Sequence, residues 1–298
     1  MQSIYVPTVE VLETSRSNLW TRRPDIRNDR RFTLSSFATG AQEAEEGQPQ
    51  KKLRETEEGP PHTQMQVIQN VATWLQDRDH VISLSKGLFL AGLGAFFVIR
   101  HPIHSRYNKE GREAIKESRV DWREISLLSG VGVGSLVLPL SYVFLANPSL
   151  APVQHFANGA VARLFSRFDY SSLGARGVLA LTAAGVLAEA AGLYLFWRSH
   201  YDLAENWSPS LELRHEHRLV TSGVYTYVRH PLYLSVFMLA ASQALLLPNW
   251  LAGWPMLASF APLYWVRVTR EERMMEDAFG QEYRDYMQKT GRIFPRLF

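Results

Sequence analysis

The sequence predicts an all-α integral membrane protein with about five transmembrane helices, the last two of which form a C-terminal helical hairpin. The first observation is a series of five apolar runs, at residues 81–99, 125–146, 178–197, 232–247 and 250–266. The second is a short Pro248-Asn249 turn between the last two runs, and the third is a set of polar and basic residues on both flanks of that pair. A helix crosses the hydrocarbon core with about twenty residues, so runs of this kind predict membrane spans.

Residues 1–65 are expected to form a disordered polar N-terminal tail. The chain has 298 residues and a formal net charge of +3, and its mean hydropathy just below zero hides an uneven distribution. Residues 42–61 have almost no large apolar side chains, so they bury too little surface to offset the entropy lost on ordering. Early arginines suggest a transit peptide as the rival interpretation, but acidic residues lie among them, and such peptides are usually poor in acidic residues.

Residues 66–200 are expected to hold the first three membrane helices. The second and third runs have the length of a span, whereas the first carries Lys86 near its start and is open to an interfacial placement. Glu189 lies inside the third run, where an ionisable group is costly in lipid. We therefore expect it to face the bundle interior or a polar cavity, with a structural hydrogen bond favoured over a catalytic role.

The orientation follows from the basic loop between the first two runs, because such loops favour the cytoplasmic side. The loop carries Arg100, Arg106, Lys109, Arg112, Lys116, Arg119 and Arg123. Counting spans onward puts residues 200–229 and the C-terminus on the same side. The glycosylation sequon Asn206-Trp207-Ser208 is therefore expected to be unmodified.

Residues 201–298 are expected to form the functional core, which begins with a polar segment that leads into the hairpin. In this segment, the turn Thr221-Ser222-Gly223 allows the backbone to approach a ligand closely. Pro231 suits the first turn of a helix, which places His230 at the helix N-terminus, where free N–H groups face an anionic group. For this segment alone, ordinary interfacial anchoring by His, Arg and Tyr side chains is an equal alternative.

A second cluster, Arg267-Val-Thr-Arg-Glu271-Glu272, follows the last apolar run and leads into an amphipathic C-terminal helix with the pattern Phe-Gly-x-x-Tyr-x-x-Tyr. Arg267 and Glu271 are four residues apart, so they share one face if the helix continues. Glu272 points about a hundred degrees away from Glu271 on such a helix. An exposed ion pair between Arg267 and Glu271 would be a structural explanation, although it is worth only about 0.2–0.5 kcal/mol.

The two clusters, in this order around the hairpin, resemble the isoprenylcysteine carboxyl methyltransferase (ICMT) family and its phospholipid-methyltransferase relatives over residues 207–298. The resemblance rests on His-x-Leu-Val-x-x-Gly-x-Tyr, Arg-His-Pro-x-Tyr and Arg-x-x-x-Glu-Glu. It implies a cytosolic pocket for S-adenosyl-L-methionine, with Arg267 and Glu271 as catalytic residues and Arg267 in contact with the methyl acceptor. The cofactor-binding residues would be His217, Leu219, Val220, Gly223, Tyr225, His230, Pro231, Leu232, Tyr233 and Glu271. Leu232 and Ser235 lie where members of the family vary, often with a glycine near Ser235, which loosens any inference about acceptor size.

By this resemblance, the protein is expected to be a protein-S-isoprenylcysteine O-methyltransferase of the endoplasmic reticulum, with its active site facing the cytosol. Its partners would be a prenylated protein C-terminus or a small lipid-like acceptor together with membrane lipids, and no nucleic acid. The nucleophile would be a C-terminal carboxylate, which is ionised at neutral pH without help from a base. Catalysis would then need alignment and exclusion of water more than proton transfer.

Three rivals remain open: a phospholipid N-methyltransferase, an NADPH-dependent enzyme of the sterol-reductase kind, and a non-enzymatic membrane scaffold. Two other patterns receive structural interpretations. Arg100-His101-Pro102 echoes the Arg-His-Pro motif by coincidence, because it lacks the Gly-x-Tyr turn and the tyrosine. His215-x-His217 has no third ligand at a suitable spacing, and the chain has no cysteine, so no metal site is expected.

Overall fold

The computed structural model describes residues 62–110, 115–118, 121–145, 160–209, 211–214 and 217–296. The chain divides into the units Met1–Glu58 and Gly59–Phe298, and all described residues lie in the second. Most of the predicted tail therefore lies outside the described residues, as do Arg112, Arg119 and His215. The predicted tail boundary at residue 65 falls inside a helix, α1 (His62–Trp74).

Three helical segments are long and apolar enough to cross a membrane within the described ranges, namely Arg78–Lys109, Trp122–Leu145 and Ala175–Asn206. The first corresponds to α2 (Arg78–Glu110). The second consists of α3 (Trp122–Gly132), the π-helix η2 (Val133–Val137) and α4 (Leu138–Leu145), which follow one another without a break. The third consists of α7 (Ala175–Leu203) and η3 (Ala204–Asn206). The first and third contain the predicted runs 81–99 and 178–197, and the second covers the run 125–146 as far as Leu145. The expected count of five is not reached by this criterion in the described residues: α8 (Pro231–Leu246) has only 16 residues, and the helix that follows the Pro248-Asn249 turn is not among the candidate spans.

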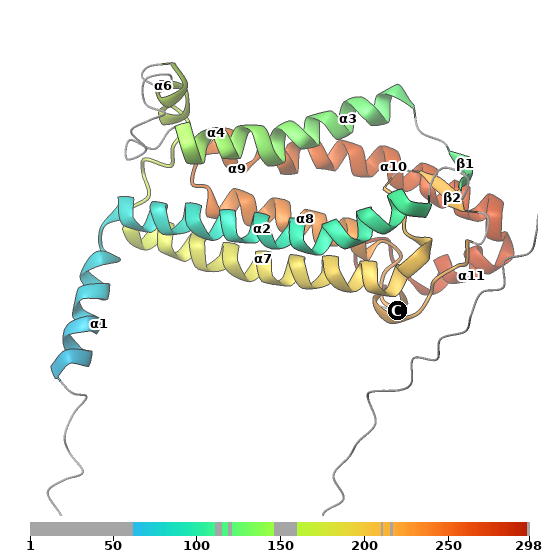
Figure 1. The fold of residues 1–298 in the computed structure, drawn as a ribbon, viewed down its shortest axis with the longest axis horizontal. Coiled ribbons are helices and arrows are strands. Elements are labelled where there is room, and N and C mark those ends of the chain that lie inside the picture. Colours follow the sequence, from blue (N-terminus) through green and yellow to red (C-terminus); the bar gives the residue numbers. More distant parts are fainter. Residues whose placement is uncertain are drawn as a thin grey trace, which may run out of the picture. The chain divides into compact units, whose positions relative to one another are not determined.

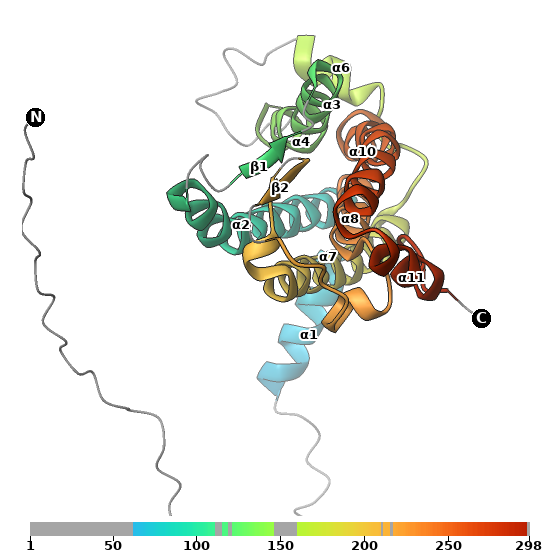
Figure 2. The same cartoon turned by 90° about the vertical axis from the view of Figure 1, so that its right-hand side faces the viewer.

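The helices pack in pairs: α7 lies against α2 and α8, and α10 (Pro255–Phe279) lies against α3 and α8 (Figures 1 and 2). Small residues permit the close approach of α7 and α8, since a Cβ at Gly185 would lie 2.8 Å from Leu246 and one at Gly192 would lie 3.1 Å from Leu239. Gly134 plays the same part at the start of α10, where a Cβ would lie 2.7 Å from the backbone of Pro255. Close backbone approach at small residues is the usual way in which membrane helices associate.

The predicted turn at Pro248-Asn249 is confirmed, and Asn249 explains it. Its side chain accepts hydrogen bonds from the N–H groups of Leu251 and Ala252 and thereby caps α9 (Trp250–Gly253). The same side chain donates to the carbonyl of Phe165 at the end of α6 (Ala160–Ser166). After this turn α10 begins with Pro255 at its first position and continues through Pro262 as far as Phe279.

Two further features place the polar segments. A small antiparallel sheet pairs β1 (Ile115–Ser118) with β2 (Glu212–Arg214), so the expectation of a purely α fold was wrong on this point. The short helix η4 (Gly223–Thr226) follows, and the chain ends in α11 (Gln281–Lys289). Beyond α11, the carbonyls of Gly291 and Arg292 accept the N–H groups of Arg229 and His230, both at 2.8 Å. The segment after α11 is thus bonded to the residues that precede α8.

Candidate active site

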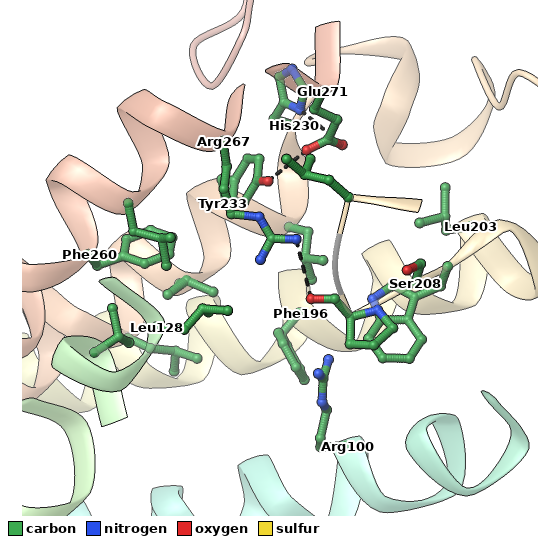
Figure 3. Close-up of a pocket in the computed structure, with 18 of the residues that line it drawn as sticks. Arg100, Leu128, Phe196, Leu203, Ser208, His230, Tyr233, Phe260, Arg267 and Glu271 are labelled. Carbon is green, nitrogen blue, oxygen red and sulfur yellow. Dashed lines mark hydrogen bonds and ion pairs between the residues drawn. The ribbon is translucent and has the colours of Figure 1, made fainter. Parts of the chain in front are cut away.

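A cavity of about 510 Å³ runs between α2, α3, α7, α8 and α10. On α10, Phe260 and Leu263 precede Arg267 and Glu271, and on α2, Phe96 precedes Arg100. Two polar residues, Glu189 of α7 and Gln243 of α8, lie further along the otherwise apolar part. Figure 3 shows Glu271, Arg267 and Arg100 around the middle of the view and Leu128 and Phe260 at its left-hand side. The cavity therefore joins a charged end to an apolar channel.

The cavity brings together nine of the eleven residues singled out from the sequence. They are His217, Leu219, Val220, Tyr225, His230, Leu232, Tyr233, Arg267 and Glu271. The other two, Gly223 and Pro231, do not line it and act on the backbone instead. Pro231 is buried at the first position of α8, directly after the N-cap residue His230.

Position 223 requires glycine for two reasons, its backbone conformation and the closeness of Asp202. Its φ is +62°, in the left-handed region, and a Cβ would lie 2.1 Å from Oδ2 of Asp202 on α7. The same oxygen accepts the N–H of Val224 at 2.8 Å, while Arg198 pairs with the other carboxylate oxygen at 2.9 Å. The loop that carries the predicted cofactor residues is therefore fixed to the end of α7.

His230 and Tyr233 meet Glu271 across the interface of α8 and α10. The Tyr233 hydroxyl donates to Oε2 of Glu271 at 2.6 Å, and Nδ1 of His230 lies 3.8 Å from Oε1. His230 is buried, whereas the Glu271 carboxylate is one-third exposed and lines the cavity. The arrangement presents one carboxylate, one imidazole and one aromatic ring to the same space.

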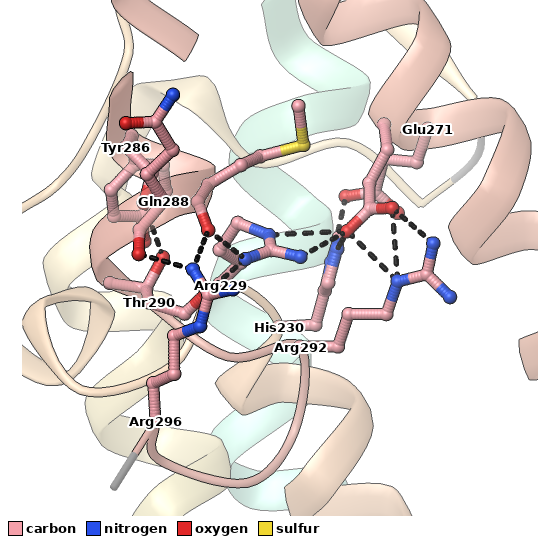
Figure 4. Close-up of polar contacts among 10 residues, drawn as sticks. Arg229, His230, Glu271, Tyr286, Gln288, Thr290, Arg292 and Arg296 are labelled. Carbon is pink, nitrogen blue, oxygen red and sulfur yellow. Dashed lines mark hydrogen bonds and ion pairs between the residues drawn. The ribbon is translucent and has the colours of Figure 1, made fainter. Parts of the chain in front are cut away.

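Glu272 lies at the centre of a buried network of charged side chains, which was not predicted from the sequence. Figure 4 shows Arg229, His230 and Arg292 converging on one point, and the shortest contacts to the Glu272 carboxylate are 3.0, 3.3 and 2.7 Å respectively. Burial acts to raise the pKa of Glu272, but the hydrogen bonds from His230, Arg292 and Arg229 outweigh it and lower the pKa to about 2. Glu272 is therefore ionised at neutral pH.

This network ties the end of the chain to the site. Arg229 also donates to the carbonyls of Met287 and Thr290, at the end of α11, and the hydroxyl of Tyr286 donates to the carbonyl of Tyr225 at 2.5 Å. No local spacing connects Arg292 with Glu272, which is why sequence reasoning missed the pair. The sequence offered one signal, the adjacent acidic residues Glu271 and Glu272, which cannot both lie on the same helix face as Arg267.

Arg267 shares the cavity with Glu271 as predicted, but within the described part of the chain the two form no ion pair. Instead, Nε of Arg267 lies 3.3 Å from Oε1 of Glu124 in α3, without hydrogen-bond geometry, and a terminal nitrogen donates to the carbonyl of Pro209 at 3.2 Å. The interpretation as an exposed i,i+4 pair was therefore wrong. Glu124 is fully buried and compensates the charge of Arg267 at the edge of the apolar channel.

A second ion pair lies one turn further along the same two helices, where Arg270 pairs with Asp121 at 2.8 Å. Arg270 and the backbone N–H of Glu124 lower the pKa of Asp121 to about 2. The start of α3 therefore forms ion pairs with two arginines of α10, Arg267 and Arg270, which are three residues apart. Only the inner one, Arg267, lines the cavity.

Glu189 lines the cavity, which confirms that it faces the bundle interior. It lies against Gly92 of α2, where a Cβ would clash with its carboxylate at 1.7 Å. In the described part of the chain it has no hydrogen-bond partner, so the expected structural hydrogen bond is not found.

These features define an integral membrane protein whose helices enclose a cavity with a charged end and an apolar channel. Residues 186–277 match the model of the isoprenylcysteine carboxyl methyltransferase (ICMT) family. Over this segment the chain is similar to the methyltransferases of that family.

The curated relatives agree with this assignment. The chain is 25% identical to protein-S-isoprenylcysteine O-methyltransferase of Schizosaccharomyces pombe over 224 residues, covering 73% of this chain and 86% of that protein. It is 35% identical to the Dictyostelium discoideum enzyme of the same name over 29% of this chain and 36% of that protein. It is also 38% identical to methanethiol S-methyltransferase 1 of Bradyrhizobium diazoefficiens over 26% of each chain.

A solved structure of the eukaryotic intramembrane Ras methyltransferase ICMT aligns with a TM-score of 0.37 and 24% identity, over 59% of this chain and 68% of that one. The chain thus spans most of the S. pombe relative but about a third of the D. discoideum one.

Proposed function

We propose that the protein transfers a methyl group from S-adenosyl-L-methionine to the C-terminal carboxylate of a prenylated cysteine, in a protein or in a small lipid-like acceptor. The observation that carries the proposal is the single cavity that joins the charged motif residues to an apolar channel between membrane helices. One end suits a polar methyl donor and a carboxylate, and the other suits an isoprenoid tail.

The charged end fits the proposed cofactor in its chemistry. The donor carries a methyl group on a sulfonium cation, and the Glu271 carboxylate and the Tyr233 ring are groups that stabilise a cation. Tyr225 adds a buried aromatic ring, and the loop carrying His217, Leu219 and Val220 completes the lining. The hydrogen bond that the Val224 N–H donates to the Asp202 carboxylate holds this loop in place.

Arg267 has the position and the free donors to hold the acceptor carboxylate. A guanidinium group has five N–H donors. In Arg267, Nε faces Glu124, and one terminal nitrogen donates to the carbonyl of Pro209. The remaining donors lie at the boundary between the charged end and the channel. Holding an ionised carboxylate there supplies alignment, and the surrounding apolar walls exclude water, which are the two terms this reaction needs.

The apolar channel matches a long hydrocarbon tail. Between Tyr233 and Gln243, both of which line the cavity, α8 advances by about 15 Å at 1.5 Å per residue. The tail would enter from the bilayer and the cofactor from the cytosol, the side that the basic residues around the end of α2 favour for the charged end. The endoplasmic reticulum is the proposed compartment.

Methyl transfer by the purified protein in detergent tests the proposal. Labelled S-adenosylmethionine and a farnesylated cysteine analogue should give label that mild alkali releases as methanol. Arg267→Ala should abolish this transfer, and Arg267→Lys should lose most of it while keeping cofactor affinity, because lysine has no planar fork for two carboxylate oxygens. The matched control is Arg270→Lys, on the same helix but bonded to Asp121 outside the cavity.

The outcomes separate the alternatives. Alkali-stable label would assign the acceptor to an amine or thiol instead of a carboxylate. Folded protein that binds no S-adenosylmethionine would refute the cofactor assignment. Equal loss of cofactor affinity and of transfer in Arg267→Lys would contradict the role given to Arg267.

A further inference from the structure

A second arginine enters the charged end of the cavity from the side opposite to Arg267. Arg100, near the C-terminal end of α2, lines the cavity, and Figure 3 shows Arg100 and Arg267 approaching the space beside Phe196 from different helices. Both guanidinium groups line the same cavity. The proposed acceptor site therefore has two guanidinium groups, of which the sequence motifs include one.

Arg100 is held by neutral groups. Its guanidinium carbon lies 4.4 Å from the centroid of the Trp207 ring, and its NH1 lies 3.3 Å from Nε2 of His200. Nδ1 of His200 lies 2.8 Å from the carbonyl of Phe196, which only accepts, so Nδ1 carries a proton. In neutral His200 the other nitrogen is then an acceptor, which orients the Arg100 guanidinium without compensating its charge.

The missing element is an anion. Arg229 has Glu272 and Arg267 has Glu124, but among the residues that the structure describes no carboxylate lies within ion-pair distance of Arg100. A partly buried cation without a counter-charge is unfavourable, and a second cation nearby adds to the cost. A carboxylate bound at this point would relieve both effects.

We propose that Arg100 is a second carboxylate-binding residue of this cavity, an inference that rests on the proposed function. The carboxylate belongs either to the acceptor, shared with Arg267, or to the methionine part of the cofactor. One face of the Arg100 guanidinium lies on the Trp207 ring, and NH1 donates to Nε2 of His200. Other N–H donors of Arg100 therefore remain for a carboxylate. His101 and Pro102 are exposed, so the echo of the Arg-His-Pro motif stays coincidental while Arg100 itself is functional.

The test compares ligands that differ only in the carboxylate, using full-length protein in detergent. In the acceptor arm, farnesylated cysteine analogues with a free carboxylate and with an amide compete for the site. In the cofactor arm, S-adenosylhomocysteine is compared with methylthioadenosine, which lacks the amino-acid part. The ratio of the two affinities in each arm does not depend on the fraction of protein that is active.

Arg100→Gln should lower the preference for the carboxylate by about tenfold or more in one arm, as expected for loss of one charge-assisted hydrogen bond. Arg100→Lys keeps the charge and should recover part of that preference. The matched control is Arg106→Gln, on the same helix but exposed and bonded to the carbonyl of Ala204.

The arm that responds identifies the source of the carboxylate. Unchanged ratios in both arms for Arg100→Gln, in a protein that still transfers methyl groups, would overturn this inference alone. Absence of methyl transfer in the wild-type protein and in Arg106→Gln would instead overturn the proposed function on which it rests.

Discussion

Replacing Glu272 with glutamine should destabilise the site more than any other single change in its charge network. Glu272 is the shared carboxylate for Arg229, His230 and Arg292. The substitution keeps the shape and one acceptor oxygen, but it removes the negative charge. The segment after α11, which is bonded to Arg229 and His230 through the backbone of Gly291 and Arg292, should then detach more readily.

The magnitude follows from how deeply each partner is buried. The side chains of Glu272 and Arg229 are 8% and 9% exposed, and breaking such a buried pair destabilises by about 3–5 kcal/mol because it leaves one charge uncompensated. The glutamine oxygen retains part of the hydrogen bonding, so the expected loss is about 3 kcal/mol. Arg292 is 44% exposed, so Arg292→Gln should cost about 1 kcal/mol or less.

Thermal unfolding in detergent distinguishes these values. A loss of about 3 kcal/mol corresponds to a fall in Tm of about 6–12 °C for a domain of this size, whereas Arg292→Gln should lower Tm by only a few degrees. Glu276→Gln, one turn further along α10 and outside the network, serves as the control. A wild-type Tm in Glu272→Gln would refute the argument, and so would equal effects of Glu272→Gln and Arg292→Gln.

The pH dependence gives an independent check. The pKa of Glu272 is about 2 in the folded protein and 4.5 for an ordinary glutamate, because hydrogen bonds outweigh the opposing effect of burial. A carboxyl with a lowered folded pKa stabilises fully above its unfolded pKa and loses that contribution as the pH falls toward the folded value. The stability of the wild-type protein should therefore decline from about pH 4.5 toward pH 2, with a shallower decline in Glu272→Gln.

Three further outcomes are expected. Gly223→Ala should weaken binding of S-adenosylhomocysteine in calorimetry and lower Tm, because its φ is +62° and the new Cβ would clash, whereas Gly174→Ala, with no atom within 4 Å, should do neither. Asn249→Ala should lower the free energy of unfolding by about 2 kcal/mol, since it removes a helix cap and one of the two donors to the carbonyl of Phe165, and an unchanged Tm would count against this. Because the chain has no cysteine, Lys109→Cys should react with a membrane-impermeant maleimide from the cytosolic side and Ser171→Cys only after permeabilisation, and the reverse pattern would invert the proposed topology.

Local patterns were enough to predict the features that depend on local geometry. Apolar length located the three long spans, and the positions of Pro231 and Gly223 located the start of α8 and the turn before it. The continuation of the helix past the last apolar run was also predicted from the spacing of Arg267 and Glu271. In each case the relevant constraint lies within a few residues of the pattern.

The partners of the charged residues could not be predicted, because they come from distant parts of the chain. A four-residue spacing shows that Arg267 and Glu271 share a helix face, but not that Glu124, about 140 residues earlier, lies opposite that face. The same is true of Arg292 at Glu272 and of Arg100 in the cavity. The pairing of β1 with β2 also joins segments that no sequence periodicity connects.

The charges around Arg267 also explain why one arginine is insufficient for the proposed acceptor. Arg267 already faces the buried carboxylate of Glu124, so a second carboxylate at this arginine alone would meet a pair with no net charge. Arg100, on the other side of the cavity, adds a guanidinium group that pairs with no carboxylate among the described residues, and its charge is available to the incoming anion. In a partly buried site this difference decides whether an ionised carboxylate is bound or excluded. Selectivity for a charged acceptor group would therefore depend on helix α2, which lies outside the matched segment 186–277.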